Sequence, residues 1–136
     1  RQRLEAERSS LLASLRPARA VAAQVPRLRA GTVGVHIRRS DHESAKKHSP
    51  DDLFIKAMDE RSARSGRPCQ FFLATDDPGV EESLRRRFER QLRTLPKRTL
   101  DRAAPEGIEA ALADLLTLAQ CECIFGSYES SFSRIA

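Results

Sequence analysis

Four short apolar segments alternate with segments of helical character along this chain, and this alternation constrains the fold more than any other feature. Each apolar segment has the length and the β-branched or aromatic content of a buried strand. They cover residues 32–37, 69–74, 91–95 and 122–125. Strands separated by helices are typical of a parallel sheet, because each crossover has to return the chain to the same edge. The sequence therefore predicts an α/β fold, a Rossmann-like parallel sheet with helices on both faces.

Helices are predicted between these strands, where apolar residues recur at helical spacing. The predicted helices cover residues 2–15, 21–28, 50–65, 78–90 and 105–120, and a last one begins at Ser131. The helix after Ser49 has the clearest start, because serine is a common N-cap and Pro50 suits the first helical position. Leu53 in that helix and Ile108 in the fifth helix are expected to face the core.

The composition is that of a soluble globular domain. The chain has 136 residues, of which 40% are hydrophobic and 32% charged, enough for one domain with its own core. No apolar run approaches the length of a membrane span. Three cysteines without paired zinc-finger spacing predict structural thiols in a reducing compartment, and we expect the bacterial cytoplasm. Because the first residue is Arg1 and not methionine, we expect a further segment upstream, and targeting signals cannot be judged from this end.

The positive charge does not indicate a nucleic-acid-binding protein. The formal net charge is +5, but acidic residues interrupt the basic ones, and only 5% of the residues are aromatic and able to stack on bases. We therefore expect an anionic small molecule as the ligand, and no nucleic acid. A metal ion is not expected either, because His42 and His48 lie in a segment whose spacing does not fix metal ligands.

The first apolar strand ends in a cluster of functional side chains. The segment from Val33 to Asp41 reads VGVHIRRSD and delivers His36, Arg38 and Arg39 to one strand end. The guanidinium group of arginine presents its N–H donors in a fixed fork that matches pairs of phosphate oxygens. Open α/β sheets bind ligands at the carboxyl ends of their strands. The cluster therefore predicts a ligand that carries a diphosphate.

The other three predicted strands also end in polar residues, and in a parallel sheet all four ends share one edge. These residues are Thr75, Asp76, Asp77, Lys97, Arg98, Ser127, Ser130 and Ser131. Several have an ordinary structural alternative, since aspartate and serine before a helix are common N-caps. The motifs GxGxxG, GxxxxGK(S/T) and GxSxG are absent, which disfavours dehydrogenases, P-loop NTPases and α/β-hydrolases. What favours a binding site is that all four clusters fall on the same edge.

The chain also resembles a known enzyme family in the order HIRRSD, SPDDLF, FFLATDDP and DLLTLAQCECIFGSYESSFSRIA. This order is similar to the donor-binding half of the nodulation-type and core α-1,6-fucosyltransferases, to which protein O-fucosyltransferases are more distant relatives. The resemblance covers residues 15–136. It implies the C-terminal domain of a GT-B glycosyltransferase. Residues 1–16 would then be a helical connector from a missing N-terminal domain, and residues 17–136 a nucleotide-sugar-binding domain truncated at its C-terminus.

The resemblance also implies roles for individual residues. Arg38 matches the essential arginine that holds the donor diphosphate and stabilises the departing GDP, and is therefore the expected catalytic residue. His36 and Asp114 match the pair that recognises guanine, while Arg39 and Asp41 match positions that orient the site. The remaining donor-binding positions are matched by Asp76, Asp77, Ser130 and Ser131. Core fucosyltransferases carry glutamine where this chain has Ser131.

The implied reaction is an inverting transfer of fucose from GDP-fucose to a hydroxyl of a glycan acceptor, without a metal ion or other cofactor. The missing N-terminal domain would complete the acceptor site, so the chain alone is expected to bind GDP weakly and to be inactive. No carboxylate of the chain is assigned as the general base. Two alternatives stay open: a domain that binds another nucleotide sugar, and a catalytically inactive nucleotide-binding module.

Overall fold

A four-stranded parallel sheet forms the centre of the protein, as predicted. The computed structural model describes residues 2–39, 47–97, 99–101, 103–128 and 130–136. The strands are β1 (Val33–Ile37), β2 (Phe71–Thr75), β3 (Leu92–Arg93) and β4 (Cys123–Gly126). Their order across the sheet is β3-β2-β1-β4, and Val33 lies opposite both Phe71 and Cys123. This is the order with which the Rossmann fold begins.

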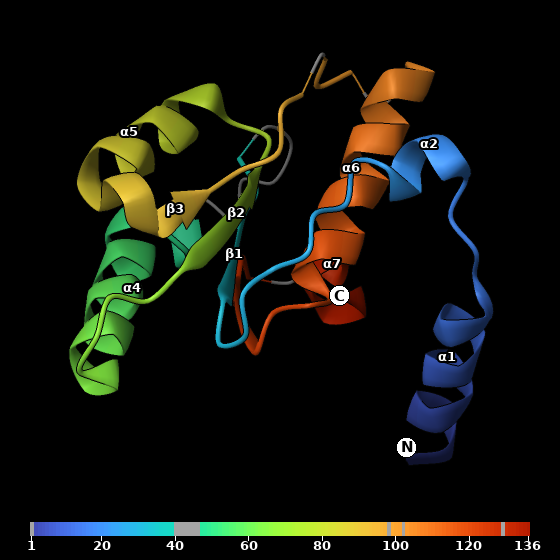
Figure 1. The fold of residues 1–136 in the computed structure, drawn as a ribbon, viewed down its shortest axis with the longest axis horizontal. Coiled ribbons are helices and arrows are strands. Elements are labelled where there is room, and N and C mark those ends of the chain that lie inside the picture. The colour runs from blue at the N-terminus through green and yellow to red at the C-terminus, as the bar shows by residue number, and fades with distance from the viewer. Residues whose placement is uncertain (1, 40–46, 98, 102, 129) are drawn as a thin grey trace.

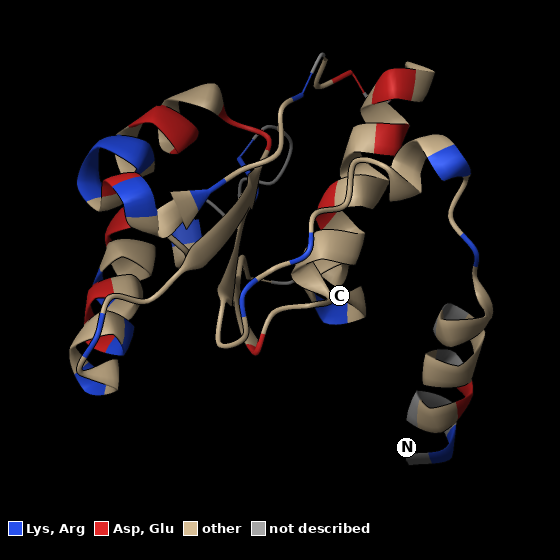
Figure 2. Cartoon of the chain, in the orientation of Figure 1, with Lys and Arg blue, Asp and Glu red and all other residues tan. Residues whose placement is uncertain are grey.

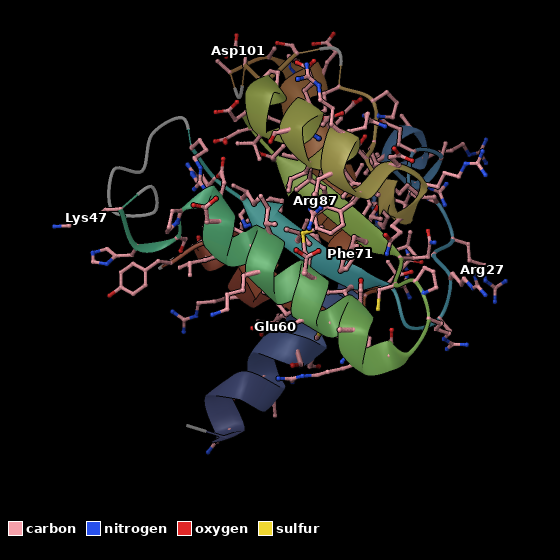
Figure 3. All side chains as sticks on the ribbon, turned by 90° about the vertical axis from the view of Figure 1, so that its left-hand side faces the viewer. Arg27, Lys47, Glu60, Phe71, Arg87 and Asp101 are labelled. Carbon is pink, nitrogen blue, oxygen red and sulfur yellow. The ribbon has the colours of Figure 1, made fainter. Side chains whose placement is uncertain are left out.

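Helices cover both faces of the sheet (Figure 1). One face packs against α4 (Asp51–Ser65) and α5 (Pro78–Phe88), which runs into a short 3-10 turn, η1 (Glu89–Gln91). The other face carries α6 (Pro105–Leu118), α2 (Arg19–Ala22) and the short α7 (Ser131–Ile135). Figure 3 views the first of these faces, where Phe71 lies beneath the helices and its ring meets that of Phe88 edge-on at 5.5 Å. The helix α1 (Gln2–Ser14) stands apart from this body in Figure 1.

Side chains of β1 point alternately to the hydrophobic core and to the opposite face of the sheet, where the candidate site lies. Val33, Val35 and Ile37 are fully buried against α4 and α5. Gly34 and His36 point to the opposite face, because successive residues of a strand alternate. A Cβ atom on Gly34 would lie 2.9 Å from a methyl group of Leu118, so α6 packs directly on β1 at this position. His36 is thereby placed beneath the elements that carry Asp114 and Ser130.

Several element boundaries differ from the prediction. The helix expected over 21–28 ends at Ala22, and Pro26, which has no N–H group to continue a helix, follows it. The third strand is only two residues long, and it lies at the edge of the sheet. Ser49 does not cap α4; the N-cap position is Pro50, and no side chain caps it. Ser49 instead accepts a hydrogen bond from the Tyr128 N–H group through its Oγ at 2.9 Å.

Two side chains expected in the core are exposed. Leu53 is 53% exposed on α4 and Ile108 is 56% exposed on α6. The helical spacing of apolar residues defines a wide stripe, but the sheet covers only the middle of it. In α4 the covered residues are Phe54 and Met58, and in α6 they include Leu118. The predicted burial of Leu53 and Ile108 was therefore wrong, although the helices that contain them were predicted correctly.

The charged residues lie mainly on the helices, where opposite charges are paired (Figure 2). On α5 the arginine run faces outward, and Arg85 contacts Glu81 at 2.8 Å while Arg86 pairs with Glu82. Arg87 reaches Asp59 of α4 at 3.0 Å. The run is thus a solvated helical face. In the part of the chain that the structure describes, no helix is both long and apolar enough to cross a membrane.

Candidate functional site

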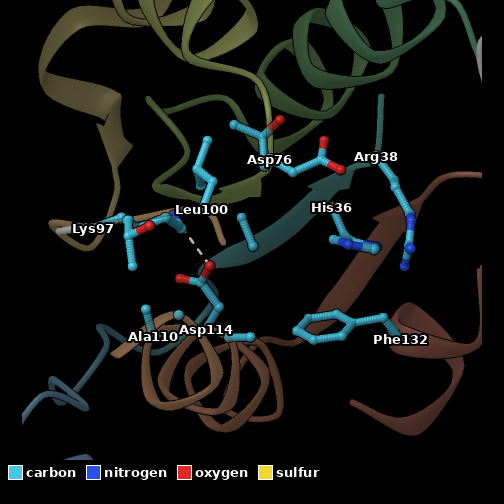
Figure 4. Close-up of a pocket in the computed structure, with 13 residues that line it drawn as sticks. His36, Arg38, Asp76, Lys97, Leu100, Ala110, Asp114 and Phe132 are labelled. Atoms are coloured by element: carbon cyan, nitrogen blue, oxygen red, sulfur yellow. Dashed lines mark ion pairs between the residues drawn. The ribbon is translucent and has the colours of Figure 1, made fainter. Parts of the chain in front are cut away.

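The strand order places a ligand-binding crevice at the carboxyl ends of β1 and β4. After β1 the chain builds the sheet toward β3, and it then returns to the other side of β1 to form β4. Ligands of open α/β sheets bind at such a switch point. A pocket of about 50 Å³ opens there, lined by His36, Arg38, Asp76, Lys97, Asp114 and Phe132 among others (Figure 4). Beyond Lys97 it adjoins a wider depression of about 560 Å³.

His36 lies on the pocket wall and is held from two sides. It is the fourth residue of β1, it is 6% exposed, and its ring stacks on Phe132 with 4.7 Å between the ring centroids. Its Nδ1 atom lies 3.4 Å from Ser133 Oγ and 3.5 Å from Ser130 Oγ. A hydroxyl group can donate or accept, so this arrangement can serve either tautomer of the imidazole. The ring is thus fixed between α7 and the pocket.

Arg38 leaves the end of β1 and reaches the pocket beside His36 (Figure 4). Its side chain is half-buried. Its backbone N–H donates to Ser127 Oγ at 3.0 Å, and the same hydroxyl donates to the carbonyl of His36 at 3.2 Å. Because Ser127 is itself buried, the start of the Arg38 side chain has a defined position. Arg38 can therefore present its fork of donors to an anion at the strand end.

Arg39 points the other way, into the protein. It is 8% exposed, and its Nη2 atom donates to Asp51 Oδ1 at 2.5 Å and to the carbonyl of Ser49 at 2.7 Å. Its Nη1 atom donates to the carbonyl of Arg38 at 3.1 Å. These bonds connect the end of β1 to the start of α4. The geometry gives Arg39 a positioning role and does not bring its guanidinium to the pocket.

The two adjacent aspartates after β2 also differ, since one lines the pocket and the other makes a structural contact. Asp76 lines the pocket, and its Oδ1 atom accepts the backbone N–H of Arg39 at 2.7 Å. Asp77 is the N-cap of α5, where its Oδ1 atom accepts the N–H groups of Gly79 and Val80. Of the pair, Asp76 is the one that lines the pocket, while Asp77 has the ordinary capping role.

Asp114 and Lys97 form an ion pair at the bottom of the pocket (Figure 4). Asp114, on α6, is 4% exposed, and its Oδ2 atom lies 3.1 Å from Lys97 Nζ. Burial raises the pKa of Asp114 to about 6, while Lys97 opposes the rise. Asp114 Oδ1 and Lys97 Nζ are both buried, and neither has a hydrogen-bond partner among the described residues. The contact between them is thus a close ion pair that uses one of the two carboxylate oxygens.

The structure places the other predicted site residues at the margin. Ser130 is buried behind His36, and Ser131 is exposed at the first position of α7. Asp41 lies outside the described residues. Among the described residues, no group of three or more His, Cys, Asp or Glu side chains is arranged to hold a metal ion.

Three residues with contacts at this site were not among the donor-binding residues that the resemblance implied. Ser127 fixes the backbone of Arg38, Phe132 stacks on His36, and Lys97 pairs with Asp114. Lys97 had a signal, because it follows the third predicted strand. Ser127 follows β4 directly and Phe132 lies in α7, but only the tertiary structure shows that they meet β1.

The fold of the chain is similar to that of solved fucosyltransferase structures. NodZ α-1,6-fucosyltransferase co-crystallised with GDP is similar over 100% of this chain and 41% of that one, with a TM-score of 0.56 and 24% identity. Fucosyltransferase NodZ from Bradyrhizobium is similar over 79% of this chain and 35% of that one, with a TM-score of 0.55 and 28% identity. NodZ soaked with GDP-fucose gives a TM-score of 0.52 at 24% identity.

The chain therefore spans about two fifths of the length of the solved structures it matches end to end. No protein-family model matches the sequence, and no curated protein sequence matches it. The evidence for kinship is thus the fold, together with the motifs that lie on its ligand-binding edge. The predicted resemblance is confirmed at this level: the chain has a fucosyltransferase-like fold, similar to that of the nodulation-type α-1,6-fucosyltransferases.

Proposed function

We propose that residues 17–136 form the domain that binds GDP-fucose in an inverting glycosyltransferase acting on a glycan acceptor. The observation that carries this proposal is one pocket that joins Arg38 at a strand end to the buried carboxylate of Asp114. One group suits a diphosphate and the other suits the N–H donors of a base. Solved structures of similar fold were obtained with GDP and with GDP-fucose, which supports the same ligand here.

In the proposed reaction, Arg38 stabilises the leaving group. An acceptor hydroxyl oxygen forms a bond to the anomeric carbon of fucose on the side opposite GDP. The bond between that carbon and the β-phosphate oxygen breaks, and GDP leaves with the electron pair. The acceptor proton passes to a general base, which is not assigned to a residue of this chain. Negative charge grows on the diphosphate during this step, and a preorganised guanidinium stabilises it most in the transition state.

At the other end of the pocket, Asp114 accepts N–H groups of the guanine base. A buried acceptor without a partner is costly, and a ligand N–H donor removes that cost. His36 and Phe132 form an aromatic wall along the same pocket, against which a flat base can pack. In this proposal the donor is neutralised by fixed protein groups, and no metal ion takes part.

A competition experiment with nucleoside diphosphates tests the proposal. We expect GDP to bind more tightly than UDP and ADP, because the carboxylate of Asp114 needs adjacent N–H donors on the base. Isothermal titration of each nucleotide into the chain, under identical salt, measures the preference. If UDP binds best, the fold serves another nucleotide sugar. If none of the three binds, a nucleotide-binding function is excluded.

GDP affinity is expected to fall as the pH drops below about 6, which is the raised pKa of Asp114. Below that pH the free protein holds a proton on Asp114, and this proton must leave before the carboxylate can accept from the base. The loss approaches tenfold per pH unit for one such group. The groups that act on this carboxyl are Lys97, which lowers the pKa, and Glu81, which raises it.

The Asp114→Asn variant provides the control for this pH profile. Phosphate groups of GDP also titrate near pH 6, and they do so equally for both proteins. We expect the difference between the two pH profiles to isolate Asp114. The stability of the ligand-free protein should change in the opposite direction, because the folded state takes up the proton near pH 6 and the unfolded chain only near 3.8. As the pH falls from 7 to 4, the contribution of Asp114 to the free energy of unfolding therefore increases. Identical binding profiles would contradict a direct role of Asp114.

A further inference from the structure

The pocket floor presents one buried donor and one buried acceptor side by side. Lys97 Nζ and Asp114 Oδ1 have no hydrogen-bond partner among the described residues, although Nζ lies only 3.1 Å from the other carboxylate oxygen. The Lys97 side chain is 13% exposed and that of Asp114 is 6% exposed. Both residues line the pocket at the switch point (Figure 4). A buried donor next to a buried acceptor is unfavourable until a ligand supplies the complementary pair.

Lys97 is part of the pocket wall and is not a counterion on the protein surface. Lys97 comes from the segment that follows β3, and Asp114 comes from α6, so the pair bridges two parts of the chain. Small residues of α6, among them Gly107 and Ala110, line the pocket next to the pair. They leave the space above the two charged groups open to a flat ring. The ammonium group is therefore within the pocket wall that would meet the edge of a base.

Few bases complement such a pair in a single orientation. Guanine and hypoxanthine carry a carbonyl at position 6, beside an N–H group at position 1, and uracil carries the same pair at positions 4 and 3 of its smaller ring. Adenine carries an amino group at position 6 and an unprotonated nitrogen beside it, so its donors and acceptors are exchanged. Adenine would have to turn over in the pocket to satisfy the same two groups, and its ribose would then leave in another direction.

We propose that Lys97 is a specificity-determining residue, whose ammonium donates to the 6-carbonyl of a purine while Asp114 accepts the neighbouring N–H. This inference rests on the proposed function, and it adds the residue that distinguishes bases with a carbonyl beside an N–H group from adenine and cytosine. Lys97 also keeps the carboxylate in place, so its removal alone would not separate the two roles. A double-mutant cycle with a modified base does so.

The experiment compares GDP with 6-thio-GDP, in which sulfur, a weak acceptor, replaces the carbonyl oxygen and the N–H group is kept. Both are titrated at pH 7 into the wild-type chain and into Lys97→Met. We expect the wild type to prefer GDP by roughly tenfold or more, as a hydrogen bond to a charged group implies. Lys97→Met should bind both nucleotides with nearly equal, lower affinity. Lys97→Arg should recover part of the preference, because it restores a cation.

Two controls keep the outcome interpretable. Lys56→Met removes the same charge from the exposed side of α4 and should change neither affinity. Circular dichroism checks that Lys97→Met is folded, and Lys97→Gln, which removes the charge but keeps a polar partner for Asp114, serves as the test variant if it is not. If the wild type does not prefer GDP over UDP and ADP, the proposed function fails. If it does, but Lys97→Met retains the full preference for GDP over 6-thio-GDP, only the role of Lys97 is overturned.

Discussion

The Arg38→Ala variant is expected to bind GDP roughly 10- to 100-fold more weakly than the wild type, with little change in stability. Arg38 lines the pocket, and its side chain is half-buried at the end of β1. A charge-assisted hydrogen bond contributes about 1.5–3 kcal/mol, and about 1.4 kcal/mol corresponds to a tenfold change in affinity. The backbone bond of Arg38 to Ser127 does not depend on its side chain, so the strand end should be preserved.

The phosphate dependence of this effect makes the prediction specific. If Arg38 holds the diphosphate, the variant should lose affinity for GDP and lose little for guanosine, which has no phosphate. Isothermal titration of both ligands provides the comparison. Arg90→Ala is the matched control, since it removes the same charge from η1, which precedes β3 at the opposite edge of the sheet. Equal GDP affinity of Arg38→Ala and wild type would refute the diphosphate contact.

Much of the fold could be predicted because local pattern and tertiary structure agree there. The strand segments are apolar throughout and lie between helices, and a parallel sheet buries such strands on both faces. The fully buried side chains of β1 and β2 confirm this. Prediction failed at the edges of the elements. Leu53 and Ile108 fit a helical stripe as well as their neighbours do, and only the packing of whole helices on the sheet decides which residues are covered.

The site, like the fold, could be predicted only in part. His36, Arg38, Asp76 and Asp114 lie around one pocket. The first three could be selected from the sequence because strand ends of a parallel sheet meet at one edge, whereas Asp114, within α6, was selected through the family resemblance. Their orientations could not be predicted. Asp76 and Asp77 are neighbours, yet one lines the pocket and the other caps α5. The sequence contains the residue types, whereas the direction of each side chain depends on the backbone after the strand ends.

Arg39→Met is expected to have the opposite effect to Arg38→Ala: a large loss of stability with a smaller loss of GDP affinity. The Arg39 guanidinium is buried and donates to Asp51, to the carbonyl of Ser49 and to that of Arg38. Methionine keeps the length and apolar bulk of the side chain but leaves these acceptors without their donor. We expect a decrease of about 2–4 kcal/mol in the free energy of unfolding. The loss is not larger because Asp51 is 45% exposed and can be solvated again.

Urea denaturation measures this loss, and Arg87→Met is the matched control. Arg87 pairs with Asp59 on the surface at 3.0 Å, and with side chains 58% and 45% exposed this pair should contribute no more than about 1 kcal/mol. Arg39→Lys should lie between Arg39→Met and the wild type, because a single ammonium cannot reach three acceptors in the fork geometry. Should Arg39→Met be as stable as the wild type and yet lose GDP affinity as Arg38→Ala does, its guanidinium contacts the donor directly. The expected reversal between two adjacent arginines follows from their position at the end of β1, where one side chain enters the pocket and the next anchors the strand to α4.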